Sequence, residues 1–277
     1  MEQRKVFPSE DIQIPSLEKY LRTVAIIRRN WKKGEAIDSR GDEKALWYRG
    51  QANSSWGLTP SRWREAYAEA NESEMRLEFE SVGRQLVPAD HQRDKWGWYF
   101  LMAHYGAPTR LLDWTVNPLV ALYFAVSSVN SNADAAVWVI DPWNWNEVHI
   151  PHLWGPALPD WKETKPYLWN IEKAQDTDNK EANRKWPIAI EPPHIDKRIS
   201  AQEGRFFLFG NAKDMVEAPG VNRKGRGKKA KLDKIIIPSA KAKTIRDELH
   251  RISINEKTIF PDLSGLAKHI CWEWHKF

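Results

Sequence analysis

Residues 104–125 read HYGAPTRLLDWTVNPLVALYFA and join a cluster of polar and aromatic side chains to an apolar stretch. The polar half brings together imidazole, phenol, hydroxyl, guanidinium, carboxylate and indole groups. Such groups are costly to bury unless they find partners, so their concentration here indicates either a tight structural network or a functional site. A second short motif, Trp47-Tyr48-Arg49-Gly50, lies upstream.

The apolar half of this stretch predicts a buried helix. Asn117 is a suitable N-cap and Pro118 suits the first helical position. The residues that follow are apolar nearly all round, which is typical of a helix in the core. Periodicity predicts further helices at residues 16–33, 72–87, 93–105, 240–252 and 260–274, and strands at residues 46–50, 110–114, 135–141, 205–209 and 234–238.

These elements alternate without a regular βαβ rhythm, and no internal repeat is present. The sequence therefore predicts an α+β fold with a single mixed domain. We assign residues 1–40 to an N-terminal helical segment and residues 41–277 to the main domain. Within the main domain, residues 142–199 form a Trp/Pro-rich insertion with little periodicity and a polar run at residues 175–184.

The composition excludes several classes of site. A single cysteine, Cys271, excludes an intramolecular disulfide and a cysteine-based zinc site. The eight histidines are dispersed in the sequence, so no metal is expected. The N-terminus lacks a signal-peptide pattern and no segment approaches ~20 consecutive apolar residues, so we expect a cytoplasmic protein without membrane contact.

Sixteen tryptophans and a net charge of +5 stand out in the composition. The indoles can fill the core or line an aromatic binding surface. Much of the excess positive charge lies at residues 223–234, RKGRGKKAKLDK, which is either a solvated loop or a nucleic-acid contact. On the second interpretation the nucleic-acid ligands are Arg223, Lys224, Arg226, Lys228, Lys229 and Lys231.

Arg49 ends a predicted strand next to Gly50, where another backbone or a ligand can approach closely. A guanidinium group there can bind a phosphate through two charge-assisted hydrogen bonds, or form an ordinary salt bridge. Asp113, between two apolar neighbours, is expected to be buried and paired with Arg110. His104 lies at a helix C-terminus, where it can be a base or a partner of the helix dipole.

The chain resembles the FRG domain over roughly residues 40–270. The resemblance rests on Tyr48-Arg49-Gly50, on the block at residues 104–125 and on Gln202-Glu203-Gly204-Arg205-Phe206. It implies an effector or toxin component of bacterial defence or toxin–antitoxin systems, with a cognate antitoxin as a possible partner.

The order of these motifs also resembles that of ADP-ribosyltransferases, which implies a split β-sheet core and NAD as co-substrate. In that family the first-strand arginine grips the NAD phosphates, and a third strand begins with Glu or Gln. The resemblance implies catalytic roles for Arg49, His104, Gln202 and Glu203. It implies NAD contacts from Tyr48, Arg49, Gly50, Tyr105, Thr109, Arg110, Asp113, Trp114 and Thr115. The family's Ser-Thr-Ser and strict Glu-x-Glu motifs are absent.

The sequence thus favours transfer of ADP-ribose from NAD to a macromolecular acceptor, with RNA ahead of DNA or protein. Two alternatives stay open: a non-enzymatic module that binds nucleic acid or protein, and a nuclease. If the first interpretation holds, Arg49, residues 109–115 and Gln202 should line one cleft.

Overall fold

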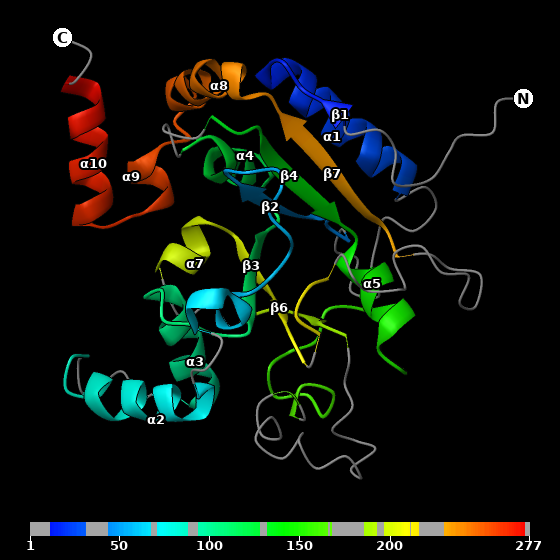
Figure 1. The fold of residues 1–277 in the computed structure, drawn as a ribbon, viewed down its shortest axis with the longest axis vertical. Coiled ribbons are helices and arrows are strands. Elements are labelled where there is room, and N and C mark those ends of the chain that lie inside the picture. The colour runs from blue at the N-terminus through cyan, green and yellow to red at the C-terminus, as the bar shows by residue number, and fades with distance from the viewer. Residues whose placement is uncertain are drawn as a thin grey trace, which may run out of the picture.

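The computed structural model describes residues 12–31, 44–67, 71–87, 94–127, 132–165, 167, 186–192, 197–210, 212–215 and 230–274. Seven strands in this part of the chain form one sheet in the order β1-β7-β4-β2-β3-β6-β5 (Figure 1). Only β1 and β7 run parallel; every other neighbouring pair is antiparallel. The strands are β1 (Ile12–Gln13), β2 (Trp47–Gln51), β3 (Leu111–Thr115), β4 (Ala135–Ile140), β5 (Ile188–Ile190), β6 (Gly204–Leu208) and β7 (Leu232–Ile237). The predicted mixed α+β class is confirmed.

The sheet is nearly divided between β2 and β3. Each of these strands pairs with its outer neighbour, β4 or β6, along its whole length. Between them, however, only Tyr48 and Thr115 are in register. The sheet therefore consists of two well-paired parts that meet at a single bridge, and the strands diverge beyond it.

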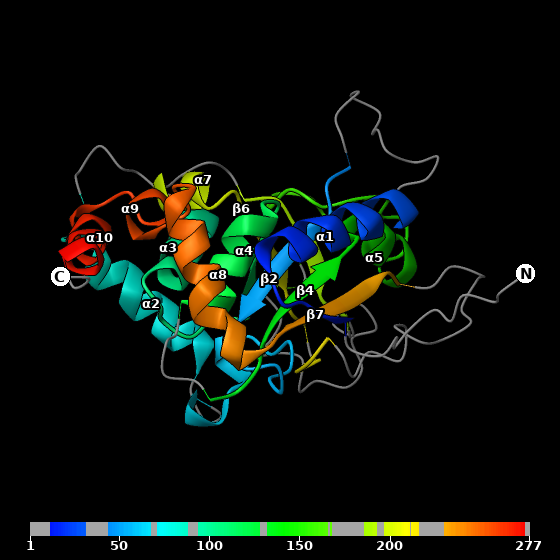
Figure 2. The same ribbon diagram turned by 90° about the horizontal axis from the view of Figure 1, so that it is seen from above.

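Helices cover both parts of the sheet (Figure 2). Residues of α1, α4 and α8 share one apolar core with β2, β4 and β7. Residues of α3 and α7 share another with β3, β5 and β6. The α-helices are α1 (Leu17–Trp31), α2 (Glu72–Gly83), α3 (Lys95–His104), α4 (Pro118–Val126), α5 (Pro142–His149), α7 (Lys197–Ala201), α8 (Ser239–Arg251), α9 (Glu256–Ile259) and α10 (Leu263–Trp274), with 3₁₀ turns at Ser61–Trp63 and Glu65–Tyr67.

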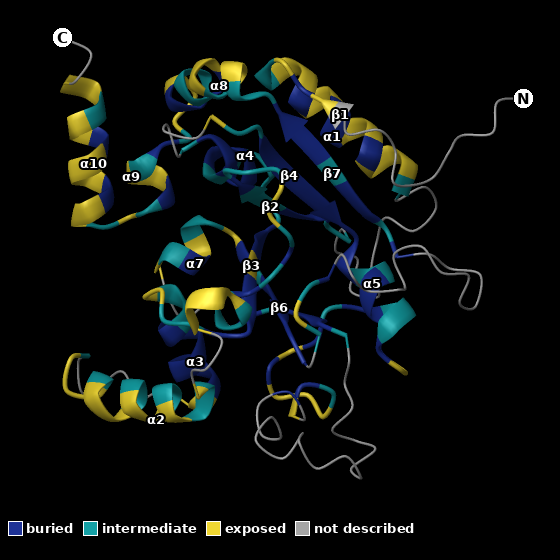
Figure 3. Ribbon diagram, in the orientation of Figure 1, coloured by how far each residue is buried: buried dark blue, intermediate teal, exposed yellow. Residues whose placement is uncertain are grey.

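The buried helix α4 forms as its sequence predicts. The Asn117 side chain accepts hydrogen bonds from the backbone N–H groups of Leu119 and Val120, and Pro118 occupies the first turn. Because most of its side chains are buried, α4 lies in the core and not on the surface (Figure 3). Its N-terminus starts directly after β3, so this helix fixes where β3 ends.

Gly50 allows α4 to pack closely on β2. A Cβ atom at Gly50 would lie 1.9 Å from the Ala121 carbonyl oxygen and 2.6 Å from the Ala125 backbone nitrogen. The close approach anticipated at this glycine is therefore that of a helix backbone. Neither strand nor helix can move aside without disturbing the core between them.

We expect Gly50→Ala to lower the free energy of unfolding by about 3 kcal/mol, because overpacking against fixed backbone is costly. Chemical denaturation measures the loss. Gly204→Ala on β6 is the matched control, since its added Cβ would meet its nearest neighbour at 3.4 Å. Equal losses for the two variants would contradict this account of Gly50.

The stretch at residues 142–199 is more regular than its sequence suggests, because it contributes α5, β5 and α7. The Asp141 side chain caps α5 by accepting from the Asn144 N–H. From α5, the buried Asn146 amide donates to the Ala189 carbonyl and accepts from the Ala189 N–H, at 3.0 and 2.9 Å. Elements this short show too little periodicity to be detected in the sequence. The Asn146 amide also takes the place of a neighbouring strand, because it pairs with both backbone groups of Ala189. The polar run at residues 175–184 lies outside the described residues.

The N-terminal helix belongs to the main core. Tyr20, Val24 and Ile27 of α1 pack with α4, α8 and the sheet, so no boundary near residue 40 separates their packing. Among the described residues, no helix has the length and apolar character needed to cross a bilayer.

Candidate functional site

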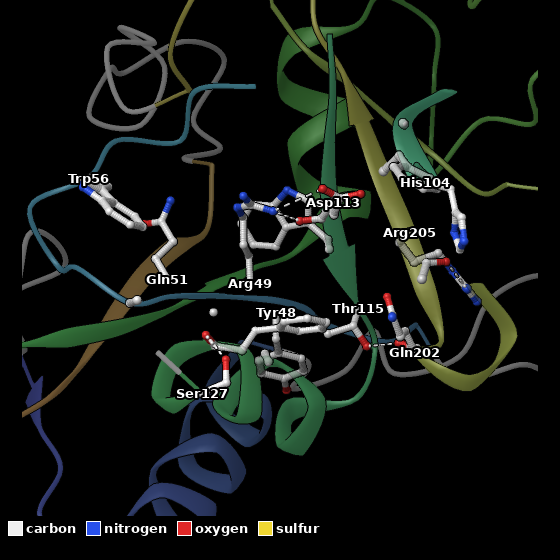
Figure 4. A pocket seen from close by; sticks show the side chains of 18 of the residues that line it. Tyr48, Arg49, Gln51, Trp56, His104, Asp113, Thr115, Ser127, Gln202 and Arg205 are labelled. Carbon is white, nitrogen blue, oxygen red and sulfur yellow. Dashed lines mark hydrogen bonds and ion pairs between the residues drawn. The ribbon is translucent and has the colours of Figure 1, made fainter. Parts of the chain in front are cut away.

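A cavity of about 870 Å³ opens where β2 and β3 diverge (Figure 4). Its wall comes from β2 and the loop after it, the end of α3, β3, α4, and the turn between α7 and β6. The polar and aromatic side chains that line it include Arg49, Gln51, Trp56, Arg64, Glu65, His104, Asp113, Thr115, Ser127, Arg198, Gln202 and Arg205. Cavities of ~300–1,000 Å³ hold ligands of cofactor size.

Arg49 closes the gap between the two parts of the sheet. Its Nη1 donates a 2.6 Å hydrogen bond to the Asp113 backbone carbonyl, and the Asp113 carboxylate lies 3.7 Å away. The Arg49 side chain is only 14% exposed, and its Nε is buried with no hydrogen-bond partner. Burial lowers the pKa of Arg49, and Asp113 raises it. This guanidinium therefore holds one structural bond and keeps an unused donor.

Arg205 supplies a second unused donor to the same cavity. It lies on β6 opposite Trp114 of β3, and Trp114 in turn lies next to the bridge at Thr115. The Arg205 Nε is buried without a hydrogen-bond partner, and the Glu191 carboxylate oxygen Oε1 lies 3.9 Å from it.

The lining residues carry more positive than negative charge. Arginines at positions 49, 64, 198 and 205 line the cavity, against the carboxylates Glu65 and Asp113. Arg198 is paired with Asp262 through two hydrogen bonds. Low-dielectric walls strengthen the field of the remaining cations, so the cavity favours an anionic ligand.

The turn that carries Gln202 is tied to β3. The Thr115 hydroxyl donates to the Gln202 carbonyl at 2.6 Å and accepts from the Asn117 N–H at 2.9 Å. The Gln202 side chain donates from Nε2 to the Ile259 carbonyl at 3.2 Å. These bonds position the Gln202 side chain at the cavity wall and occupy the Thr115 hydroxyl.

Glu203, expected to be catalytic, does not line the cavity. Its backbone has a left-handed φ of 48°, and its exposed carboxylate accepts from Asn117 Nδ2 at 3.0 Å. This turn directs Glu203 away from the site, whereas Gln202 faces it. The sequence could not distinguish the two neighbours because the direction depends on the turn.

The aromatic contribution to the cavity also differs from expectation. His104, at the end of α3, lines it, but its exposed neighbour Tyr105 does not. Trp56 lines the cavity with 55% of its surface exposed, and sequence reasoning missed it. Its place in the Asn-Ser-Ser-Trp-Gly turn, which begins three residues after Gly50 of the Tyr-Arg-Gly motif, was the available signal.

Arg110 is a structural residue and does not contact the cavity. Its Nε pairs with Glu72 at 2.5 Å, and its two terminal nitrogens donate to the Phe209 and Tyr167 carbonyls, each at 2.6 Å. The expected pairing of Arg110 with Asp113 is therefore wrong. Asp113 is also not buried, since its side chain is 70% exposed.

Of the remaining residues predicted to contact NAD, some line the cavity and others lie in the core. Thr109 is buried, its backbone N–H donates to the Ser61 hydroxyl, and it does not line the cavity. Tyr48 and Trp114 line it but are almost fully buried in core clusters, and burial raises the pKa of Tyr48 to about 12. The prediction of one shared cleft is confirmed for Arg49, for residues 113–115 and for Gln202.

The basic run lies mostly outside the described residues, which exclude Arg223, Lys224, Arg226, Lys228 and Lys229. Lys231 is described. Its Nζ donates to the Trp31 carbonyl at 2.6 Å and lies 3.8 Å from the Asp141 carboxylate. These contacts give Lys231 a structural role, which its place in a run of lysines did not suggest.

Comparison with known proteins gives one result. Residues 44–134 match the family model of the FRG domain, a segment that is less than half of the chain and extends from just before β2 to just before β4. The match contains Arg49 and the block at residues 104–125, but not Gln202. No curated protein and no solved structure matches the chain significantly.

Proposed function

We propose that this protein transfers ADP-ribose from NAD to a macromolecular acceptor. The observation behind the proposal is that Arg49 and Arg205 both bring partnerless, buried Nε donors to one cavity, which Gln202 also lines. A pyrophosphate offers charged oxygens to both guanidinium groups and would satisfy donors that the protein leaves unpaired. The FRG-domain match and the ADP-ribosyltransferase-like motif order support the same choice.

In the proposed reaction the bond between nicotinamide nitrogen and ribose C1′ breaks. Nicotinamide leaves with the bonding electron pair, and positive charge develops on the ribose. A nucleophilic atom of the acceptor then bonds to C1′ and loses its proton. Such a reaction depends on holding the phosphates and orienting the ribose more than on a strong nucleophile. Both Gln202 and Trp56 line the cavity; we assign Gln202 the role of orienting a ribose hydroxyl and Trp56 that of stacking on a ring of NAD.

We propose nucleic acid, RNA ahead of DNA, as the acceptor. The basic residues between positions 223 and 229 carry positive charges that attract phosphates, and exposed indoles stack on unpaired bases. Trp56 is one such indole at the proposed NAD site itself. The resemblance to toxin and defence effectors makes a cognate antitoxin the expected regulator.

Incubation of the purified chain with NAD labelled in the adenylate part tests this function. We expect label to move to RNA in preference to DNA or to proteins of a cell lysate, with stoichiometric release of nicotinamide. NAD labelled in the nicotinamide ring is the control and should leave no label on the acceptor. Release of nicotinamide without transfer to any of the three acceptors would contradict the proposal.

The second candidate is a binding module without transferase activity. It is favoured by Glu203, because the carboxylate expected to orient the acceptor is turned to Asn117 and away from the cavity. On this interpretation NAD or a related nucleotide binds, as calorimetry would detect, and no label is transferred. Cleavage of RNA without NAD would instead indicate a nuclease.

A further inference from the structure

Three helices at the C-terminal end bring two histidines and a glutamate together. His250 lies on α8, Glu256 begins α9 and His269 lies on α10. The three helices lie on one side of the molecule in two perpendicular views (Figure 1, Figure 2). One possible ligand atom from each residue lies within 4.8 Å of the other two.

The spacing of this cluster suits a metal ion. His250 Nε2 lies 3.3 Å from the Glu256 carboxylate oxygen Oε2. In a tetrahedral zinc site, metal–ligand bonds of about 2.0–2.1 Å place neighbouring ligand atoms about 3.4 Å apart. The histidine–glutamate pair already has that separation, and a ligand atom of His269 lies within 4.8 Å of both.

The ligand atoms are buried and lack hydrogen-bond partners. The His250 side chain is 1% exposed, and neither of its ring nitrogens has a hydrogen-bond partner. The same is true of His269 Nδ1 and Glu256 Oε2. Buried polar atoms without hydrogen-bond partners need an explanation, and here each of the three residues contributes at least one.

Groups outside the cluster orient the ligands in the manner of a metal site. His269 Nε2 lies 3.3 Å from the exposed Glu273 carboxylate, which leaves its partnerless Nδ1 for the cluster. The Tyr123 hydroxyl hydrogen-bonds to Glu256. Metal-bound histidines commonly donate their second N–H to a carboxylate, and bound carboxylates are themselves hydrogen-bonded.

We propose that His250, Glu256 and His269 bind a divalent transition metal ion, Zn²⁺ in the first instance. Three protein ligands leave one position of a tetrahedral site for water. The buried residues of α10 are only Gly265 and His269, so apolar packing holds this helix weakly. The ion would link α10 to α8 and α9. Because α9 also provides the Ile259 carbonyl that holds Gln202, the ion would support one wall of the cavity.

Metal analysis of untagged protein, followed by titration of the metal-free form with Co²⁺ and Zn²⁺, tests the proposal. We expect an equimolar metal content, a visible Co²⁺ spectrum typical of four-coordinate nitrogen and oxygen ligands, and a higher Tm with Zn²⁺ than without. His269→Ala should abolish binding. Glu273→Gln changes only an exposed orienting residue and should weaken Zn²⁺ binding by about 10–100-fold without unfolding the protein.

Cys271→Ser is the matched control, because the exposed Cys271 thiol on the same helix could bind Zn²⁺ adventitiously. This variant should bind both metals as the unmodified chain does. The proposal is overturned if the unmodified chain fails to bind Co²⁺ and Zn²⁺, if Cys271→Ser abolishes binding, or if His269→Ala leaves binding unchanged. None of these readouts requires NAD or an acceptor, so they stand apart from the proposed transferase activity.

Discussion

Replacing Glu72 by alanine is expected to lower the free energy of unfolding by about 3–5 kcal/mol, because it leaves a buried guanidinium without its counter-ion. Glu72 accepts from Arg110 Nε, from the Arg110 backbone N–H and from the Tyr99 hydroxyl. Arg110 itself is 2% exposed, so water cannot replace the carboxylate. Denaturant titration followed by tryptophan fluorescence measures the loss.

Glu74→Ala is the matched control, since Glu74 lies in the same first turn of α2 but is exposed. Both variants lose one negative charge near the helix N-terminus, worth ~0.3–1 kcal/mol. The difference between them therefore isolates the buried pair. A loss for Glu72→Ala no larger than that for Glu74→Ala would show that the network around Arg110 is not what holds this part of the fold.

If the proposed function holds, replacing Arg49 by alanine is expected to reduce ADP-ribosyl transfer by about 10²–10³-fold. Removing one hydrogen-bond donor to a negatively charged group in an active site usually has an effect of this size. Arg49 also donates to the Asp113 carbonyl, and stranding that acceptor should cost ~1–3 kcal/mol of stability. Both effects follow from one side chain that joins the parted strands and lines the cavity. Label transfer at saturating acceptor and thermal melts measure them separately.

Asp113→Ala separates the two roles of Arg49. The Asp113 side chain is 70% exposed and the carbonyl that accepts from Arg49 belongs to the backbone, so this variant should fold normally. It also removes a negative charge from the cavity wall, so NAD binding should be unchanged or tighter. If NAD binds equally well to the unmodified chain and to Arg49→Ala, Arg49 does not hold the phosphates.

Local sequence determined the elements that frame the cavity. Asn117 and Pro118 start α4. The Asn117 side chain accepts hydrogen bonds from N–H groups in the first turn, and Pro118 has no N–H group that would need a partner there. The apolar residues of the neighbouring strands predict those strands, and the apolar residues of α4 predict that this helix is buried. The polar groups at residues 104–125 indicate a structural network or a functional site, and part of this stretch lines the cavity.

Only the tertiary structure decides which residues of the 104–125 stretch line the cavity and which have a structural role. Arg110 and Asp113 are three residues apart, yet Arg110 turns inward to Glu72 and Asp113 outward, because a strand directs alternate positions differently and α2 brings in a carboxylate. The left-handed backbone at Glu203 separates it from Gln202 in the same way.

The cluster of His250, Glu256 and His269 shows the same dependence on tertiary structure, since three different helices provide its members. Their spacing in the sequence matches no metal motif, because ligands within one helix recur at fixed intervals and ligands from separate helices do not. The sequence determines which residues each helix exposes or buries. Only the packing of the helices determines which buried groups meet. The residues of one helix do not specify where the other helices lie, so the local sequence cannot predict these contacts.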